Sequence, residues 1–305
     1  MLLEEAGVPS VAVHTDVFAG VARATATANG MPQTRQAFVP QPVVDLSRAE
    51  LRAYIEGSDP ISGRPFMQEV IEALSSPLDA EDLTGLSFDR SALRLLSPDS
   101  EENLQQLFLQ NHWTDCLPIT LPTEARVAAM LKGTRHAPDE IVGRMRPTSF
   151  REVWEYTVEK VAVNAVMAGA RPEYLPVILA LAASGSTARS SSTTSMTNMA
   201  VVNGPIRHEI GMNSGIGALG PYNHANVTIG RAYALLSQNL QGGSVPGETY
   251  MGTLGNGLAY SACFAENEER SPWEPLHVQK GFKPTDSAVS VFFGLRYVRR
   301  GTARV

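Results

Sequence analysis

The chain of 305 residues is 43% hydrophobic and 18% charged, carries a formal net charge of −6 and contains two cysteines. This composition is typical of a globular protein with one large or two modest domains, and it excludes a chain that is disordered throughout. It also disfavours a nucleic-acid-binding protein or a secreted disulfide framework, because adjacent basic residues are confined to Arg299-Arg300 and the cysteines lack a paired spacing.

The N-terminal sequence shows neither an export signal nor a membrane segment. The first residues, MLLEEAGVPSVAV, carry two acids and no basic residue. No apolar run approaches the roughly 18 residues that a membrane span needs. We therefore expect a cytoplasmic protein whose partners include neither nucleic acid nor membrane.

A small α/β module is predicted over residues 1–78. A β-branched run at residues 9–13 leads into an Ala-rich helical segment at 17–29. Residues 37–44 are again strand-like, although their two prolines confine them to a sheet edge or a loop. An amphipathic helix is expected at residues 66–74, where Ser-Ser-Pro stops it.

The beginning of this module departs from the usual order of a parallel α/β sheet. In such a sheet, the first strand and the loop after it commonly supply the active site. Here residues 2–6 read as the tail of the first helix. We therefore expect a partial Rossmann-like or flavodoxin-like module without its opening strand and loop. Its sheet edge and apolar helix faces would need cover from a partner chain or a second copy.

A larger α/β (α+β) domain is predicted over residues 79–305. Thr123 is expected to cap a helix that runs to residue 131, and a long helix is expected at 150–169 because apolar residues recur there at helical spacing. Further elements are predicted in chain order: a helix at 174–183, a Ser/Thr-rich loop at 184–198, a strand at 199–203, a helix at 226–240 and a strand at 288–297.

Residues 203–281 form the candidate functional region. This stretch holds three of the six histidines, Cys263, a Glu-Asn-Glu-Glu run and many glycines. Packing alone asks for apolar periodicity, whereas short polar groups on Gly-rich backbone are typical of a binding or catalytic surface.

His224 lies in the sequence Asn-His-Ala-Asn immediately before a predicted helix. Asn223 or Asn226 can cap that helix, which leaves His224 as an ordinary exposed histidine. Alternatively, His224 and the two asparagines hold a carboxylate or a developing oxyanion at the helix N-terminus. The sequence is compatible with both interpretations.

Glu266 and Glu268 form a second candidate pair. On a strand, Cys263, Ala265 and Asn267 share one face while the two glutamates share the other. Two close carboxylates in a dry site favour acid/base chemistry, and a solvated strand end is the alternative. For Cys263 a buried, inert thiol is favoured over a nucleophile, because no neighbouring base would stabilise a thiolate.

The predicted site combines these residues with others along the chain. Trp273 is expected to form an aromatic wall, and Lys160 is either a solvated helix edge or a counter-charge inside a cleft. The predicted catalytic residues are His224, Glu266, Glu268 and His277. The predicted substrate-binding residues are Lys160, Asn213, Asn223, Asn226, Asn267 and Trp273.

The sequence gives little support for three common cofactor or nucleophile motifs. Residues 215–220 match GxGxxG, but no strand leads directly into them and no acid follows about twenty residues later, so a glycine-rich turn is favoured over an NAD site. No HxH or HExxH spacing supports a metal site, although a divalent metal is left open. No GxSxG marks a serine hydrolase.

Several long phrases resemble one family. GVPSVAVHTDVFAGVARATATANGMP is similar to the later part of the domain found in the UGSC family of selenoproteins and their cysteine homologues. Four later phrases resemble the larger region of long proteins related to it: TVEKVAVNAVMAGARPEYLPVILA, VVNGPIRHEIGMNSG, GPYNHANVTIGRA and FAENEERSPWEPLHVQKGF. The resemblance implies redox or nucleophilic chemistry at a selenocysteine-or-cysteine, Gly, Ser, Cys motif after the first strand.

Neither Cys116 nor Cys263 lies in such a motif. The leading hypothesis is therefore a subunit of an enzyme that acts on a small polar or anionic metabolite, with a small partner subunit supplying the nucleophilic cysteine or selenocysteine. Acid/base or thiol-assisted cleavage or reduction would make it a lyase, a hydrolase or a thiol-dependent oxidoreductase. The alternative is a non-catalytic structural or regulatory subunit of such a complex.

Overall fold

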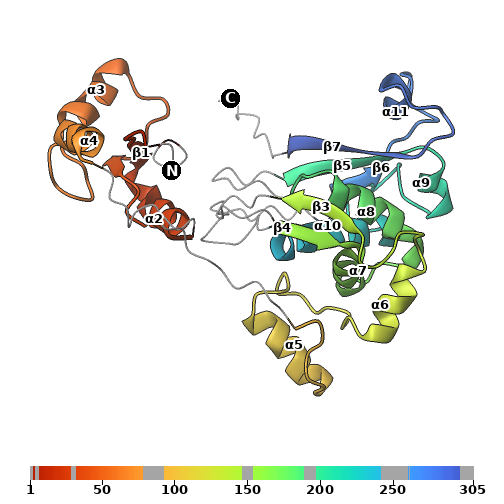
Figure 1. The fold of residues 1–305 in the computed structure, drawn as a ribbon. Coiled ribbons are helices and arrows are strands. Elements are labelled where there is room, and N and C mark those ends of the chain that lie inside the picture. Colours follow the sequence, from red (N-terminus) through yellow and green to blue (C-terminus); the bar gives the residue numbers. More distant parts are fainter. Residues whose placement is uncertain are drawn as a thin grey trace, which may run out of the picture. The chain divides into compact units, whose positions relative to one another are not determined.

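The computed structural model describes residues 3, 7–28, 32–77, 93–145, 154–188, 197–241, 260 and 262–295. The chain divides into two compact units, Met1–Arg94 with Ser149–Arg151 (unit 1) and Leu95–Thr148 with Glu152–Val305 (unit 2). Both belong to a mixed α/β protein with several small sheets (Figure 1). The boundary predicted between residues 78 and 79 lies in a segment outside the described residues, so the division into 1–78 and 79–305 stays a prediction.

Unit 1 contains a parallel pair of short strands. β1 (Ala12–Thr15) pairs with β2 (Gln36–Val39), and the two are connected by the 3-10 helix η1 (Asp16–Phe18) and by α2 (Ala19–Ala28). A parallel pair needs such a crossover, so the predicted strand-helix-strand order is confirmed. β2 ends where the prolines begin. α4 (Phe66–Ser75) was predicted, whereas α3 (Arg48–Glu56), which starts at a capping box on Ser47, was not.

Unit 2 holds the remaining elements. Its helices are α5 (Glu101–Gln110), α6 (Glu124–Leu131), α7 (Val158–Met167), η3 (Pro172–Tyr174), α8 (Leu175–Ala183), α9 (Ile206–Glu209), α10 (His224–Asn239) and α11 (Leu276–Gln279). Its strands are β3 (Ile141–Met145), β4 (Trp154–Thr157), β5 (Thr197–Asn203), β6 (Cys263–Ala265) and β7 (Ala288–Leu295).

A three-stranded sheet in the order β6-β5-β7 organises unit 2. β5 runs parallel to β6 and antiparallel to β7. The helices α7, α8 and α10 group on one side of this sheet (Figure 1), and their apolar faces form most of the core. α10 is deeply packed, since Ile229, Leu235 and Leu236 are fully buried. Of the candidate region, the described residues 203–241, 260 and 262–281 thus lie on or next to this sheet and α10.

The helix predicted at residues 150–169 is partly wrong. Trp154–Thr157 form β4, which pairs antiparallel with β3, and α7 begins only at Val158. Aromatic and β-branched residues favour a strand there, and the Thr157 hydroxyl accepts a hydrogen bond from the backbone N–H of Lys160 (3.4 Å), which starts the helix. The predicted apolar stripe is buried from Val158 onward.

Within the described residues, no helix is both long enough and apolar enough to span a lipid bilayer.

Candidate functional site

Two parallel strands of unit 2 end side by side. β5 ends at Asn203 and β6 at Ala265, and the short helices α9 and α11 lie at that end of the sheet (Figure 1). In α/β sheets, ligands commonly bind just beyond the carboxyl ends of parallel strands. The polar side chains gathered here are called the carboxylate cluster below: Asn203, Arg207, Glu266, Glu268, Glu269 and His277.

Arg207 is the centre of the carboxylate cluster. It projects from α9 and is only 5% exposed. Its Nε donates to the Gly204 carbonyl (3.1 Å), and Nη1 donates to the Glu266 carbonyl (3.0 Å) and to Glu269 (3.1 Å). Its Nη2 donates to Glu268 (2.9 Å) and to Glu269 (2.7 Å). All five guanidinium donors are therefore used inside the protein.

Asn203 brings the two predicted glutamates together. Its buried side-chain amide donates to Glu266 Oε2 and, at 3.0 Å, to Glu268 Oε1. Backbone N–H groups complete the arrangement: Gly204 donates to Glu268 (2.8 Å) and Leu276 donates to Glu266 (2.9 Å). Gly204 has φ +82°, and a Cβ there would lie 2.0 Å from a backbone carbonyl oxygen, so only glycine fits.

His277 lies on α11 beside this pair. Its side chain is buried, and Nδ1 is 3.9 Å from Glu268 Oε1, which is too long for a hydrogen bond. Among the described residues, neither ring nitrogen of His277 has a hydrogen-bond partner, and Asn203 Oδ1 has none either. Buried polar atoms are nearly always paired, so three unpaired atoms in one cluster mark it as a candidate ligand site.

The cluster carries an excess of negative charge. Of its three carboxylates, Glu268 and Glu269 pair with the one guanidinium, and Glu266 accepts only from neutral N–H groups. The exposed His208 adds a contact from Nε2 to Glu269 (3.0 Å). Hydrogen bonding to Arg207 is the main cause that lowers the pKa of Glu269 to about 2. The local charge therefore disfavours a second anion and favours a neutral or cationic group.

Glu269→Gln should reveal this pairing through the pH dependence of stability. Because the folded-state pKa of Glu269 lies below its ordinary 4.5, the stabilisation is complete above that pH and is lost as the pH falls toward about 2. The side chain is 55% exposed, so we expect a loss of less than about 1 kcal/mol at pH 7. Urea unfolding should show this difference shrinking below pH 4.5. A constant difference, or an equal effect of Glu274→Gln in the same loop, would contradict the assignment.

His224, Asn223, Asn226 and Asn213 form a separate hydrogen-bonded group. Asn223 is the N-cap of α10, and its Oδ1 accepts from the Asn226 N–H (3.0 Å). The buried Asn226 side chain accepts from Asn213 N (3.1 Å) and donates to Asn213 O (2.9 Å). His224 Nδ1 lies 3.3 Å from the Tyr174 hydroxyl. Within the described chain, no hydrogen bond joins His224 to the carboxylate cluster, and the two asparagines act as a cap and a loop anchor.

The remaining predicted site residues lie apart from the cluster's hydrogen bonds. Lys160 is exposed in the first turn of α7, as the solvated-edge interpretation requires, and none of its described contacts is an ion pair. Trp273 is 74% exposed and does not form a wall. The carbonyl of Asn267 accepts from Ser271 N (2.9 Å) and shapes the turn after Glu266.

The GxGxxG string forms a turn, as predicted. Residues 216–221 are turn residues, Gly217 has φ +77°, and the short helix α9, not a strand, lies before them. Among the described residues, no three His, Cys, Asp or Glu side chains are grouped so that they could hold a metal ion.

The two cysteines should differ sharply in reactivity. Burial raises the pKa of the Cys263 thiol to about 12, whereas Cys116 is exposed. We expect iodoacetamide at pH 8 to label Cys116 rapidly in the native protein and to label Cys263 only after denaturation. Mass spectrometry of peptides checks this, with Cys116→Ala abolishing the fast phase. Rapid labelling of native Cys263 would contradict its inert role.

Arg207 and Asn203 are functional candidates that sequence reasoning missed. Arg207 contacts glutamates 61 and 62 residues further along the chain, so no local spacing links them. One signal was available: an Asn-Gly-Pro sequence follows the β-branched run of β5, at the end of a strand where α/β proteins place their sites.

The N-terminal part of unit 1 can be compared with a known family. Residues 1–58 match the UGSC family model. This UGSC segment covers 58 of the 305 residues and includes β1, α2, β2 and α3. The family expected from the sequence is thus confirmed for this segment, while the kinship of the later phrases stays a prediction. No curated protein and no solved structure matches the chain.

Proposed function

We propose that unit 2 carries an enzyme site in which His277 exchanges a proton with a small polar metabolite, while Glu268 stabilises the charged imidazole. The supporting observation is the set of three buried, unpaired polar atoms on His277 and Asn203. Leaving a buried polar group unpaired costs roughly 1–3 kcal/mol. Unpaired buried polar groups of this kind occur mainly where a ligand binds to the group or a reaction uses it.

The charge of the cluster narrows the substrate class. Every donor of Arg207 is bonded to the protein's own oxygens, so Arg207 has none left for a carboxylate or phosphate. The surplus carboxylates favour hydroxyl or amine donors on the substrate. Of the two classes expected from the sequence, a polar, hydrogen-donating metabolite therefore fits better than an anionic one. Acid/base bond cleavage, by elimination or hydrolysis, is the reaction class that these groups support.

A thiol-assisted reaction would need a different nucleophile. The raised pKa of Cys263 keeps its thiol protonated. Cys116 is exposed, but neither it nor Cys263 lies in the motif that the UGSC resemblance implies. A reactive cysteine or selenocysteine in that motif would then come from another chain, such as a small partner subunit. Exposed apolar side chains on unit 1, among them Val17 and Ile71, support cover by a partner or a second copy. The mass of the native complex tests this point, and a stable monomer would count against it.

A structural role is the second candidate. Arg207 joins the turn after β5 to the loop after β6 with a complete set of hydrogen bonds, and the His277 side chain is fully buried. A clamp between two loops would show the same features. Such a clamp would make the chain the non-catalytic subunit of a complex.

The effect of His277→Leu on stability separates the two candidates without knowledge of the substrate. If the role of His277 is catalytic, removing two unpaired buried nitrogens should leave the melting temperature unchanged or raise it. If His277 instead helps to hold the two loops together, the melting temperature should fall. His112→Asn, at an exposed histidine after α5, is the control for the loss of an imidazole.

A metabolite panel then tests binding. Small amines, amino alcohols and polyols should include a compound that raises the melting temperature of the native protein, and the rise should vanish in His277→Gln and Glu268→Gln. An equal rise in wild type and both variants would refute the site. A fall in the stability of His277→Leu, with no compound bound, would favour the structural role.

A further inference from the structure

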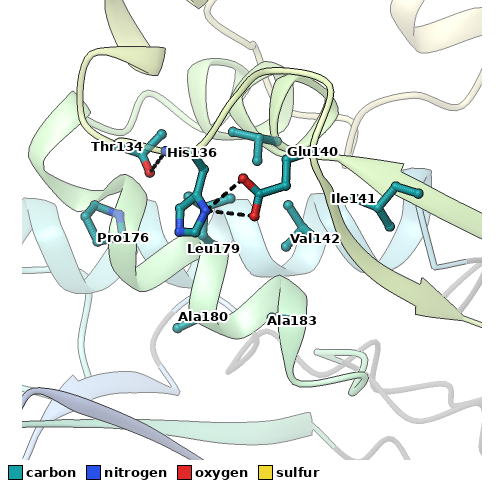
Figure 2. Close-up of a pocket in the computed structure, with 10 residues that line it drawn as sticks. Thr134, His136, Glu140, Ile141, Val142, Pro176, Leu179, Ala180 and Ala183 are labelled. Carbon is teal, nitrogen blue, oxygen red and sulfur yellow. Dashed lines mark hydrogen bonds and ion pairs between the residues drawn. The ribbon is translucent and has the colours of Figure 1, made fainter.

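A cavity lies in unit 2 at a place that none of the ten predicted site residues lines. It has a volume of about 400 Å³ and opens between the turn before β3, the start of α7 and one face of α8 (Figure 2). Its walls are mainly apolar, formed by residues such as Val142, Val158, Pro176 and Leu179. Pockets that hold small organic ligands have volumes of about 300–1,000 Å³ and a similar apolar lining.

Two polar side chains, His136 and Glu140, face each other at this cavity (Figure 2). His136 Nδ1 lies 2.9 and 3.0 Å from the two carboxylate oxygens of Glu140. The Thr134 hydroxyl accepts from the His136 backbone N–H (3.3 Å), which fixes the turn that carries the imidazole. A carboxylate bonded to Nδ1 places the ring proton on that nitrogen and holds the ring in one orientation.

The other nitrogen of His136 is then available to a ligand. With the proton on Nδ1, Nε2 carries a lone pair, and within the described residues Nε2 makes no hydrogen bond. The side chains of His136 and Glu140 are 59% and 48% exposed, so a small molecule can reach them from solvent. The cavity therefore combines apolar walls with one oriented hydrogen-bond acceptor.

We infer that this cavity binds a small apolar molecule, with one aromatic ring or a short hydrocarbon chain, whose hydroxyl group donates a hydrogen bond to His136 Nε2. Burial of the hydrocarbon against Val142, Val158 and Leu179 drives binding, and the hydroxyl fixes its orientation. The Glu140 carboxylate disfavours an anionic head group at the same place. The site shares no residue with the carboxylate cluster and goes beyond the function proposed for that cluster.

Three fluorinated probes test this inference on the full chain by ¹⁹F NMR: 4-fluorophenol, fluorobenzene and 4-fluorobenzoate. Saturable binding of 4-fluorophenol is expected, roughly five- to tenfold tighter than that of fluorobenzene because of one hydrogen bond. The benzoate should bind more weakly than the phenol. No saturable binding of the phenol, equal binding of the phenol and fluorobenzene, or preferred binding of the benzoate would overturn the inference.

Variants locate the site. Ala180→Trp and Ala183→Trp fill the cavity from exposed positions on α8, so they should abolish binding without unfolding the protein. His136→Phe should bind the phenol and fluorobenzene equally. Glu140→Gln should weaken phenol binding several-fold, while Asp139→Asn, the matched change one residue earlier, should not. Wild-type binding in both tryptophan variants would place the probe elsewhere and refute the site.

Discussion

Arg207→Met is expected to lower the free energy of unfolding by about 3 kcal/mol, because removing one partner of a buried ion pair leaves the other charge uncompensated. Glu268 is that partner, since its side chain is only 11% exposed. For a domain of this size, the loss corresponds to a fall in melting temperature of roughly 10 °C. Differential scanning calorimetry at pH 7 measures the effect.

Two control variants test whether the loss of stability comes from the buried ion pairs of Arg207. Arg207→Lys keeps the charge but loses the fork that reaches two glutamates, so it should destabilise by an intermediate amount. Arg171→Met removes an exposed arginine 3.9 Å from Glu173 and should cost less than about 1 kcal/mol. Similar losses in the Arg207 and Arg171 methionine variants would show that the cluster is not a buried ion-pair network.

Asn226→Ala should have an effect of similar size for a different reason. The side chain is fully buried and satisfies three backbone groups, Asn213 N, Asn213 O and Ala218 O. At about 1 kcal/mol for each group left unpaired, the expected loss is roughly 3 kcal/mol. Loss of these bonds also releases residues 213–218 from α10. Urea unfolding measures the stability, and limited proteolysis within this loop reports its release.

Two further substitutions distinguish the anchor from a simple helix cap. Asn226→Asp keeps the oxygen that accepts from Asn213 N but loses both donated bonds, so an intermediate loss is expected. Asn223→Ser keeps an N-cap oxygen on α10 and should stay within about 1 kcal/mol of wild type. If Asn226→Ala were no worse than Asn223→Ser, the anchoring role would be wrong.

Helix caps and apolar spacing, which depend only on neighbouring residues, correctly predicted several helices. Thr123 caps α6 as expected, and the apolar spacing in α4 and α10 places those helices within two residues of their ends. The strand β4 could not be separated from the helix α7 by periodicity, because both lie in one continuous apolar pattern. Only pairing with β3, about ten residues earlier, decides that Trp154–Thr157 form a strand.

In the candidate site, too, residues close in the sequence could be predicted, whereas residues brought in by the fold could not. Glu266, Glu268 and His277 lie within twelve residues of one another, and the structure brings them together as the sequence suggested. Arg207 and Asn203 enter only through the parallel pairing of β5 and β6, a contact between segments some sixty residues apart. The cavity beside His136 was missed as well, because its walls come from three segments that no motif connects.

The most direct measurement of the central claim is a long-range ¹H–¹⁵N NMR spectrum of the histidine side chains in the native protein, recorded with each small amine or polyol of the metabolite panel. The account predicts that a bound compound moves the ring nitrogen signals of His277, leaves those of His112 in place, and loses this effect in Glu268→Gln. A compound that binds tightly while the His277 nitrogens stay unchanged would contradict it.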